Sequence, residues 1–101
     1  MDNVEKLIND IRNDRRVSTT RFSNRFVNTI GEMYERSGYG ATHLFLQEKV
    51  QDRRMRFEAQ SVLKVLDLVK SANVSLSIGG YIIRKLPLIL NYGEMGKNAG
   101  Y

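Results

Sequence analysis

The most constraining feature of the sequence is an apolar seam that repeats at helical intervals in its second half. Its members follow one another at spacings of 4, 3, 4 and 3 residues: Met55, Ala59, Val62, Leu66 and Val69. This spacing predicts a helix with one continuous apolar face. The seam spans about two heptads, fewer than the roughly three or four that indicate a coiled coil. A helix inside a bundle and a helix across a dimer both fit, and we expect the seam to pair two chains because 101 residues supply a limited core.

Two helices are predicted in the first part of the chain. Asp2 and Glu5 have the spacing of a capping box, and apolar residues then recur at helical intervals, which predicts a helix from about Asp2 to Arg15. Ser18-Thr19-Thr20 is the expected N-cap of the next helix, because hydroxyl oxygens accept from free backbone N–H groups. We expect Gly38 to end that helix in a left-handed conformation.

The second part of the chain allows alternatives. Residues 41–72 are predicted to be helical, either continuously or with a break near Gln51-Asp52. Residues 74–78 alternate between apolar and polar, and Gly79-Gly80 offers a two-residue turn, which favours a β-hairpin. A short apolar helix is the alternative, although each internal glycine costs it ~1 kcal/mol. The expected fold is therefore mainly α, a small bundle of three to four helices with a C-terminal β-hairpin or short apolar helix.

Length and composition limit the organisation of the chain. We expect one helical domain over residues 1–90 and a flexible C-terminal tail over residues 91–101, whose glycines and polar residues offer little to bury. The absence of cysteine excludes a disulfide scaffold and a thiol nucleophile. The acidic N-terminus and the lack of a long apolar run predict a cytoplasmic protein, or a nuclear one in a eukaryotic cell, that is neither secreted nor membrane-bound.

No residue pattern indicates catalysis. His43 is the only histidine, and no neighbouring cysteine, histidine or carboxylate cluster gives it metal-ligand spacing. The glycines at residues 38–40 and 93–96 lack the spacing of nucleotide-binding loops. We therefore expect no metal, no cofactor and no enzymatic activity.

A row of basic residues opposite the seam is the strongest functional signal. On a continuous helix the solvent-facing ridge would consist of Lys49, Arg53, Arg56, Gln60 and Lys64. Guanidinium groups suit phosphate because their planar fork donates two parallel hydrogen bonds. A net charge of +5 also favours anionic partners. A charged, solvated helix face is the ordinary explanation, since Glu48, Asp52 and Glu58 lie close enough to pair with the ridge.

Two readings of the function follow. We expect a small basic regulatory protein that binds DNA or RNA through phosphate contacts as a homodimer, using Lys49, Arg53, Arg56 and Lys64 together with Arg21 and Arg25. In a minor variant, residues 17–20 form the turn of a helix-turn-helix and Arg21, Asn24, Arg25 and Asn28 face the bases. The alternative is a helical protein–protein interaction module, an inhibitor, adaptor or assembly factor. Its docking patch would be formed by Tyr81, Ile82, Ile83 and Leu86–Leu90.

Overall fold

The computed structural model describes residues 2–90, which form a succession of helices joined by short connections. The helices are α1 (Asn3–Asn13), α2 (Arg15–Ser18), α3 (Asn24–Val50), α4 (Arg56–Ala72) and α5 (Leu76–Arg84), and residues 86–90 are helical as well. The prediction of a mainly helical fold is confirmed. The bundle of three to four helices is not, because the chain turns at more places than the periodicity indicates. The predicted flexible tail, residues 91–101, lies outside the described residues.

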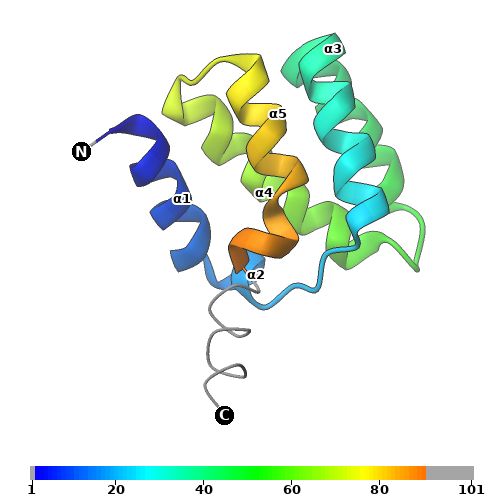
Figure 1. The fold of residues 1–101 in the computed structure, drawn as a ribbon. Helices are drawn as coiled ribbons and strands as arrows, with labels where there is room; N and C mark the ends of the chain where they lie inside the picture. Colours follow the sequence, from blue (N-terminus) through cyan, green and yellow to red (C-terminus); the bar gives the residue numbers. More distant parts are fainter. Residues whose placement is uncertain (1, 91–101) are drawn as a thin grey trace.

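Helix α4 occupies the centre of the fold. It contacts each of the other four helices, and Figure 1 shows α5 lying across it, with α1 on one side and α3 on the other. In its seam, Ala59, Val62, Leu66 and Val69 are fully buried and Met55 is half-buried. They belong to one core cluster that extends from Leu7 to Leu86. The predicted dimer interface through this seam is therefore corrected, because helices of the same chain already cover these side chains.

The glycine pair of α5 is a packing feature and not a turn. A Cβ atom at Gly79 would lie 2.7 Å from Tyr34 Cε2 and 2.7 Å from Val69 Cγ1, so only glycine lets α5 approach α3 and α4 this closely. Ser75 caps the helix, its side chain accepting from the backbone N–H of Ile78 at 3.1 Å. The predicted β-hairpin is wrong and the short apolar helix is confirmed, because close packing offsets the low helix propensity of glycine.

Helix α3 is kinked at Gly38. This residue has φ 83° and ψ −173°, a conformation that favours glycine, and the chain resumes helical geometry on the far side. The hydroxyl of Thr42 donates to the Gly38 carbonyl at 2.7 Å, across the first turn after the kink. The predicted positive φ at Gly38 is confirmed. The helix does not end there as predicted, because the chain changes direction at Gly38 and continues as helix.

The chain breaks between α3 and α4. The Asp52 carboxylate accepts from the backbone N–H of Arg54 at 3.0 Å, and the Asp52 carbonyl accepts from the N–H of Met55 at 3.0 Å. These bonds form a turn that competes with helix. Of the two possibilities for residues 41–72, the broken helix is confirmed and the continuous one is wrong.

The first two helix starts are set by side-chain caps. Asp2 accepts from Val4 N–H at 2.8 Å, as its predicted N-cap position requires. Asp14 then interrupts the predicted 2–15 helix and caps α2 by accepting from Val17 N–H at 3.2 Å. The predicted N-cap at Ser18-Thr19-Thr20 is wrong, because α3 begins later and is capped by Ser23, whose side chain accepts from Phe26 N–H at 3.2 Å.

Candidate nucleic-acid interface

The predicted basic ridge is divided by the break between α3 and α4. Lys49 lies at the end of α3, where its Nζ is 5.1 Å from the Phe45 ring centroid. Arg56 Nε donates to the carbonyl of Val50 at 2.9 Å, and Lys64 Nζ lies 3.9 Å from a carboxylate oxygen of Asp14. These residues therefore do not form one straight, free row, and part of their charge serves contacts within the chain.

Arg21 and Arg25 lie on the other side of the break in sequence, near the start of α3. Both are exposed, Arg21 in the connection that follows α2 and Arg25 in the first turn of α3. The helix-turn-helix variant is wrong, because Val17 and Ser18 belong to α2 and α3 begins only at Asn24. The short turn on which that geometry depends is absent from this region.

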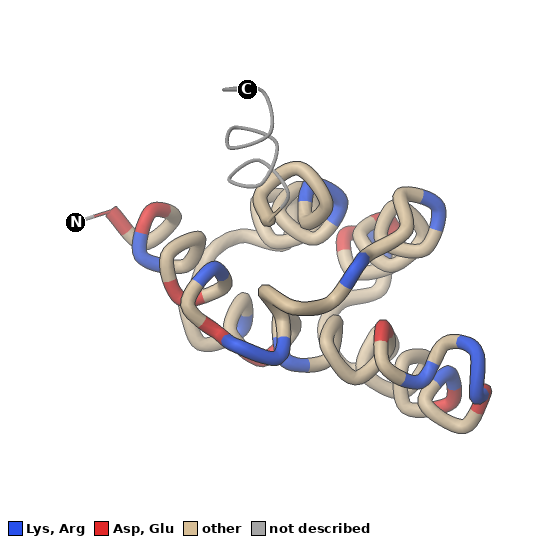
Figure 2. The backbone as a smooth tube through the Cα atoms, turned by 90° about the horizontal axis from the view of Figure 1, so that it is seen from below, with Lys and Arg blue, Asp and Glu red and all other residues tan. Residues whose placement is uncertain are grey.

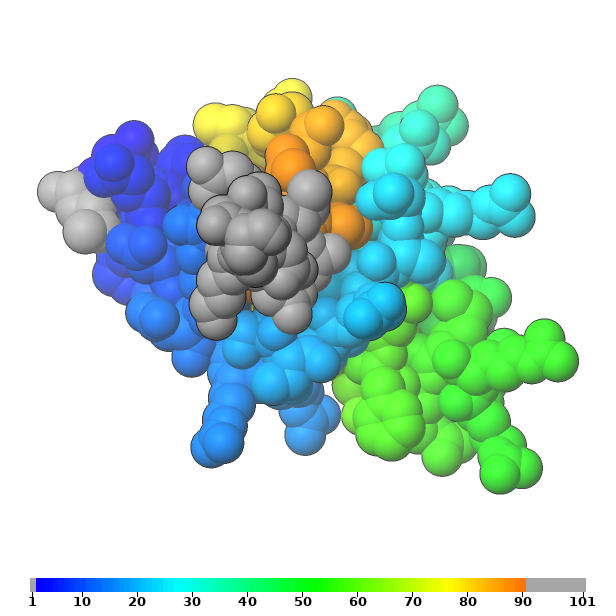
Figure 3. All heavy atoms as spheres, turned by 60° about the horizontal axis from the view of Figure 1, so that its bottom comes forward, coloured from blue at the N-terminus to red at the C-terminus, as the bar shows by residue number. Residues whose placement is uncertain are grey.

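The fold brings three basic segments to one face. Seen from below, Lys and Arg positions occur at α2, in the connection that follows it and at the turn between α3 and α4 (Figure 2). Figure 3 shows side chains of these early and middle parts of the chain projecting from the same face. Between them is an open hollow of about 550 Å³. It is lined by Arg16, Thr19, Thr20, Arg21, Arg54, Phe57, Glu58, Gln60 and Ser61.

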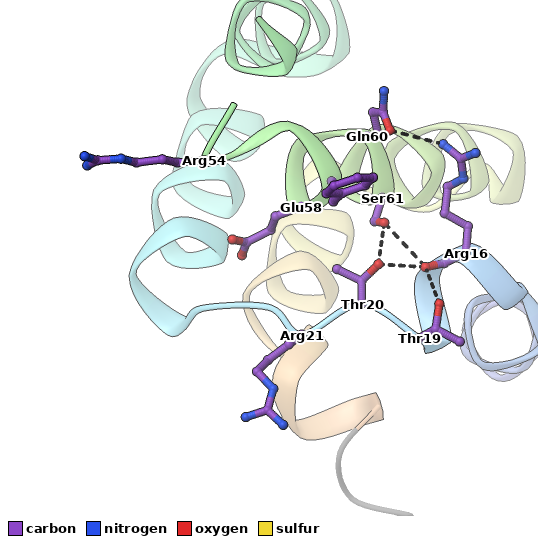
Figure 4. Close-up of a pocket in the computed structure, with 9 residues that line it drawn as sticks. Arg16, Thr19, Thr20, Arg21, Arg54, Glu58, Gln60 and Ser61 are labelled. Carbon is purple, nitrogen blue, oxygen red and sulfur yellow. Dashed lines mark hydrogen bonds between the residues drawn. The ribbon is translucent and has the colours of Figure 1, made fainter. Parts of the chain in front are cut away.

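A hydroxyl network ties the two walls of the hollow together. The oxygens of Thr20 and buried Ser61 lie 2.6 Å apart, and the Thr20 hydroxyl donates to the Arg16 carbonyl at 2.7 Å (Figure 4). Thr19 adds a bond from its hydroxyl to the Arg15 carbonyl at 2.9 Å. These bonds fix the end of α2 and the following connection against α4, so the hollow is held open by the fold itself.

Three arginines surround this hollow. Figure 4 shows Arg16, Arg21 and Arg54 on three different sides of it. Arg16 Nη1 contacts the side-chain oxygen of Gln60 at 3.5 Å, a long and weak hydrogen bond. Among the described residues none of these three arginines forms an ion pair, whereas Arg84 on α5 pairs with Glu35 on α3. The charge around the hollow is therefore available to an external anion.

Glu58 is the one acidic residue in the lining. Its carboxylate accepts from the backbone N–H of Ser23 at 2.7 Å and so joins α4 to the start of α3. Burial raises the pKa of Glu58, and the bonds from Ser23 oppose this shift. Three arginines against one carboxylate leave the lining with a net positive charge.

Of the basic residues that the sequence predicts to contact phosphate, only Arg21 lines the hollow, and Gln60 of the predicted ridge also lines it. Sequence reasoning missed Arg16 on α2, and it missed Arg54 and Phe57, which lie three residues apart where the chain enters α4. For Phe57 a signal existed: it lies on the opposite side of the helix from the seam, among arginines at positions 53, 54 and 56. An aromatic residue on the charged face of an amphipathic helix indicates a contact that the core does not require.

A second hollow has different chemistry. It is an apolar groove of about 560 Å³ between α1 and α5, continued by the segment 86–90, and its apolar lining consists of Val4, Ile8, Ile78, Tyr81, Ile82, Leu88 and Ile89. Tyr81 and Leu88 are 54% and 56% exposed, as a docking patch requires. Of the other patch residues, Ile82, Ile83 and Leu86 are buried and belong to the core.

The described part of the chain offers neither a metal site nor a membrane-spanning helix. The His43 ring lies 5.3 Å from the Tyr39 ring, centroid to centroid, in a tilted aromatic contact. Residues 2–90 contain no group of three or more potential metal-ligating His, Cys, Asp or Glu side chains. Within the same residues, none of the helices combines the length and the apolar character needed to cross a bilayer.

Comparison of the chain with protein-family models, with curated proteins and with solved structures gives no match in any of the three. The geometry and chemistry of the two hollows are therefore what indicates a function.

Proposed function

We propose that this protein binds nucleic acid through phosphate contacts made at the arginine-lined hollow. The observation that carries the proposal is that Arg16, Arg21 and Arg54, from two separate stretches of the chain, line one hollow without an ion pair among the described residues. Each guanidinium can donate two parallel hydrogen bonds to a phosphate. The hydroxyl network between Thr20 and Ser61 supports the proposal because it holds these segments in place before a ligand arrives.

The proposed binding is electrostatic and has a characteristic salt dependence. If the three arginines each neutralise one phosphate, the slope of log affinity against log salt concentration is about −2 to −3. Neighbouring exposed arginines, Arg25 and Arg53, would make the slope steeper. Phosphate contacts position a nucleic acid without specifying its sequence, so we expect probes of different sequence to bind alike.

The test is a charge reversal with a matched control. The Arg21→Glu/Arg54→Glu protein should lose affinity for an oligonucleotide by at least about 100-fold at low salt, since each of the two lost charge-assisted contacts contributes roughly 1.5–3 kcal/mol. The control, Arg36→Glu/Lys70→Glu, makes the same change in net charge at exposed positions that do not line the hollow. Equal losses in both variants, measured by fluorescence anisotropy, would show that only overall charge matters. No binding by the unchanged protein would refute the proposal.

The apolar groove favours a second candidate function, the docking of another protein. Its support is the exposure of Tyr81 and Leu88 on one open groove, since exposed apolar patches of this kind mark interaction sites. Such docking is largely independent of salt. Glutamate substitutions at Tyr81 and Leu88 should abolish capture of that partner and leave nucleic-acid binding unchanged.

A further inference from the structure

We infer that the arginine-lined hollow takes single-stranded nucleic acid and that one base stacks on the ring of Phe57. This inference rests on the proposed function and adds the substrate class.

Phe57 differs from the other phenylalanines of the chain. Phe22 and Phe26 are buried in the core, and Phe45 is half-buried under Lys49. Phe57 is 78% exposed. An aromatic ring left in water forgoes the stabilisation that burial gives, so its position in the first turn of α4 brings the folded chain no packing benefit.

The ring and the cations line the same hollow. Arg54 lies three residues before Phe57, on the turn that leads into α4, and Arg21 approaches from the connection after α2. In a single strand the face of a base is free, and the phosphate of the same nucleotide lies close to it. A site that binds a single strand can therefore contact both at once. The hollow of about 550 Å³ is within the size range of pockets for small ligands, roughly 300–1,000 Å³. Aromatic rings beside a basic surface are the recurring way in which proteins hold single strands.

A duplex could use only part of this arrangement. Its bases are paired and stacked inside the helix and offer no free face to Phe57, so a duplex would meet the arginines alone. A single strand gains both the phosphate contacts and the stacking. The presence of the exposed ring therefore favours single-stranded substrates over duplex ones.

The direct test uses the absence of tryptophan from the chain. Phe57→Trp introduces one tryptophan, which can be excited at wavelengths that tyrosine does not absorb. Titration with an unstructured oligothymidylate should quench its fluorescence through stacking, while the corresponding duplex should not. Tyr81→Trp is the control, since that position is 54% exposed but lies in the apolar groove. Quenching of both tryptophans, or of neither, when the single strand binds would overturn the inference.

The affinity test separates the ring from general apolar contact. Phe57→Ala and Phe57→Leu should each weaken single-strand binding by about 5- to 150-fold, while Phe57→Tyr should retain it. Duplex binding should change less than about twofold in all three. Because Phe57 is exposed, these proteins should fold normally, and their far-ultraviolet circular dichroism should match that of the unchanged chain.

The two proposals fail in different ways. If Arg21→Glu/Arg54→Glu abolishes binding of both probes but Phe57→Ala changes neither, the stacking inference is wrong and the phosphate-binding function stands. If Phe57→Ala weakens both probes equally, the preference for single strands is wrong. If the unchanged protein binds neither probe, both proposals fail and the exposed ring and arginines are better explained as a protein-docking surface.

Discussion

The two hollows on the surface have nearly the same size and opposite chemistry. The one between α2 and α4 measures about 550 Å³ and is lined by arginines, hydroxyls and an exposed ring. The one between α1 and α5 measures about 560 Å³ and is lined mainly by aliphatic side chains and Tyr81. Size alone therefore says nothing about their ligands. The lining of the first favours a charged, salt-sensitive ligand, and that of the second favours an apolar, salt-insensitive one.

The two hollows also differ in the interactions that fix their walls. The arginine-lined hollow is fixed by hydrogen bonds between Thr20, Ser61 and the Arg16 carbonyl, and by the bond from Ser23 to Glu58. The apolar groove depends on where α5 lies, and α5 is positioned by its glycine contacts with α3 and α4. Substitutions can therefore disturb one hollow and spare the other.

The largest expected effect is on the free energy of unfolding. It compares a buried apolar residue of α4 with an exposed apolar residue of the groove. Leu66→Asp places an unpaired charge at a fully buried position and should destabilise the fold by about 3–5 kcal/mol or unfold it. Leu88→Asp, at a position 56% exposed, should cost less than about 0.5 kcal/mol. Urea denaturation followed by circular dichroism measures both. A folded Leu66→Asp protein whose scattering mass drops from a dimer to 11.6 kDa would restore the α4 seam as a contact between chains.

The next effect contrasts the two hollows in nucleic-acid binding. Glutamate at Arg21 and Arg54 should lower affinity by at least about 100-fold. Glutamate at Ile78 and Leu88 changes the net charge by half as much and should lower affinity no more than a few-fold, because the proposed phosphate contacts lie at the other hollow. Anisotropy titrations at several salt concentrations give both values. A comparable loss from the groove variant would mean that the ligand spans both surfaces.

A smaller effect on stability tests whether the close packing of Gly79 positions α5, which forms one wall of the groove. Gly79→Ala should destabilise the fold by roughly 1–3 kcal/mol, because its Cβ would lie 2.7 Å from both Tyr34 and Val69 side chains. Gly40→Ala is the control, since nothing lies within 4 Å of the Cβ it would add. That change should stabilise α3 by about 0.4–1 kcal/mol. In thermal denaturation the melting temperature should fall for Gly79→Ala and rise for Gly40→Ala. A rise for both variants would contradict the close approach of α5.

The smallest effect concerns the one acidic group of the arginine-lined hollow. Glu58→Gln keeps an acceptor for Ser23 N–H but removes a negative charge, and should raise oligonucleotide affinity about 1.5- to 5-fold at neutral pH. The raised pKa of Glu58 sets the sign of the pH dependence. The ionised carboxylate is penalised in the folded state, and this penalty is relieved as pH falls through the raised pKa. The unchanged protein should therefore gain stability relative to Glu58→Gln on acidification from neutral pH, and the opposite trend would contradict the burial of that group.

Signals confined to a few neighbouring residues were predictable from the sequence. The cap at Asp2, the positive φ at Gly38 and the apolar face of the helix after Met55 all follow from local spacing. Gly79-Gly80 was misassigned to a turn because the reason for glycine there is Tyr34, a residue far away in the chain. The seam was assigned to a second chain because spacing shows that a face is apolar and does not show what covers it.

The candidate site was less predictable for a related reason. Its lining comes from two stretches of chain, residues 16–21 and 54–61, that only the tertiary fold brings together. The arginines of one stretch can be recognised, but their convergence with those of the other cannot. The predicted ridge assumed a continuous helix through Asp52, and the side chain of that residue is what forms the turn.

The bond between Thr20 and Ser61 joins residues 41 positions apart. Closing so long a loop costs conformational entropy, which the packing of α4 against the rest of the chain must offset. The arginine-lined hollow is consequently lost whenever that contact opens, and no fragment carrying one of its stretches retains it. A ligand that binds only the closed hollow, at a free concentration of about 100 times its dissociation constant, would lower the population of opened chains by about 100-fold. Amide hydrogens of α2 that exchange through this opening would then exchange about 100-fold more slowly.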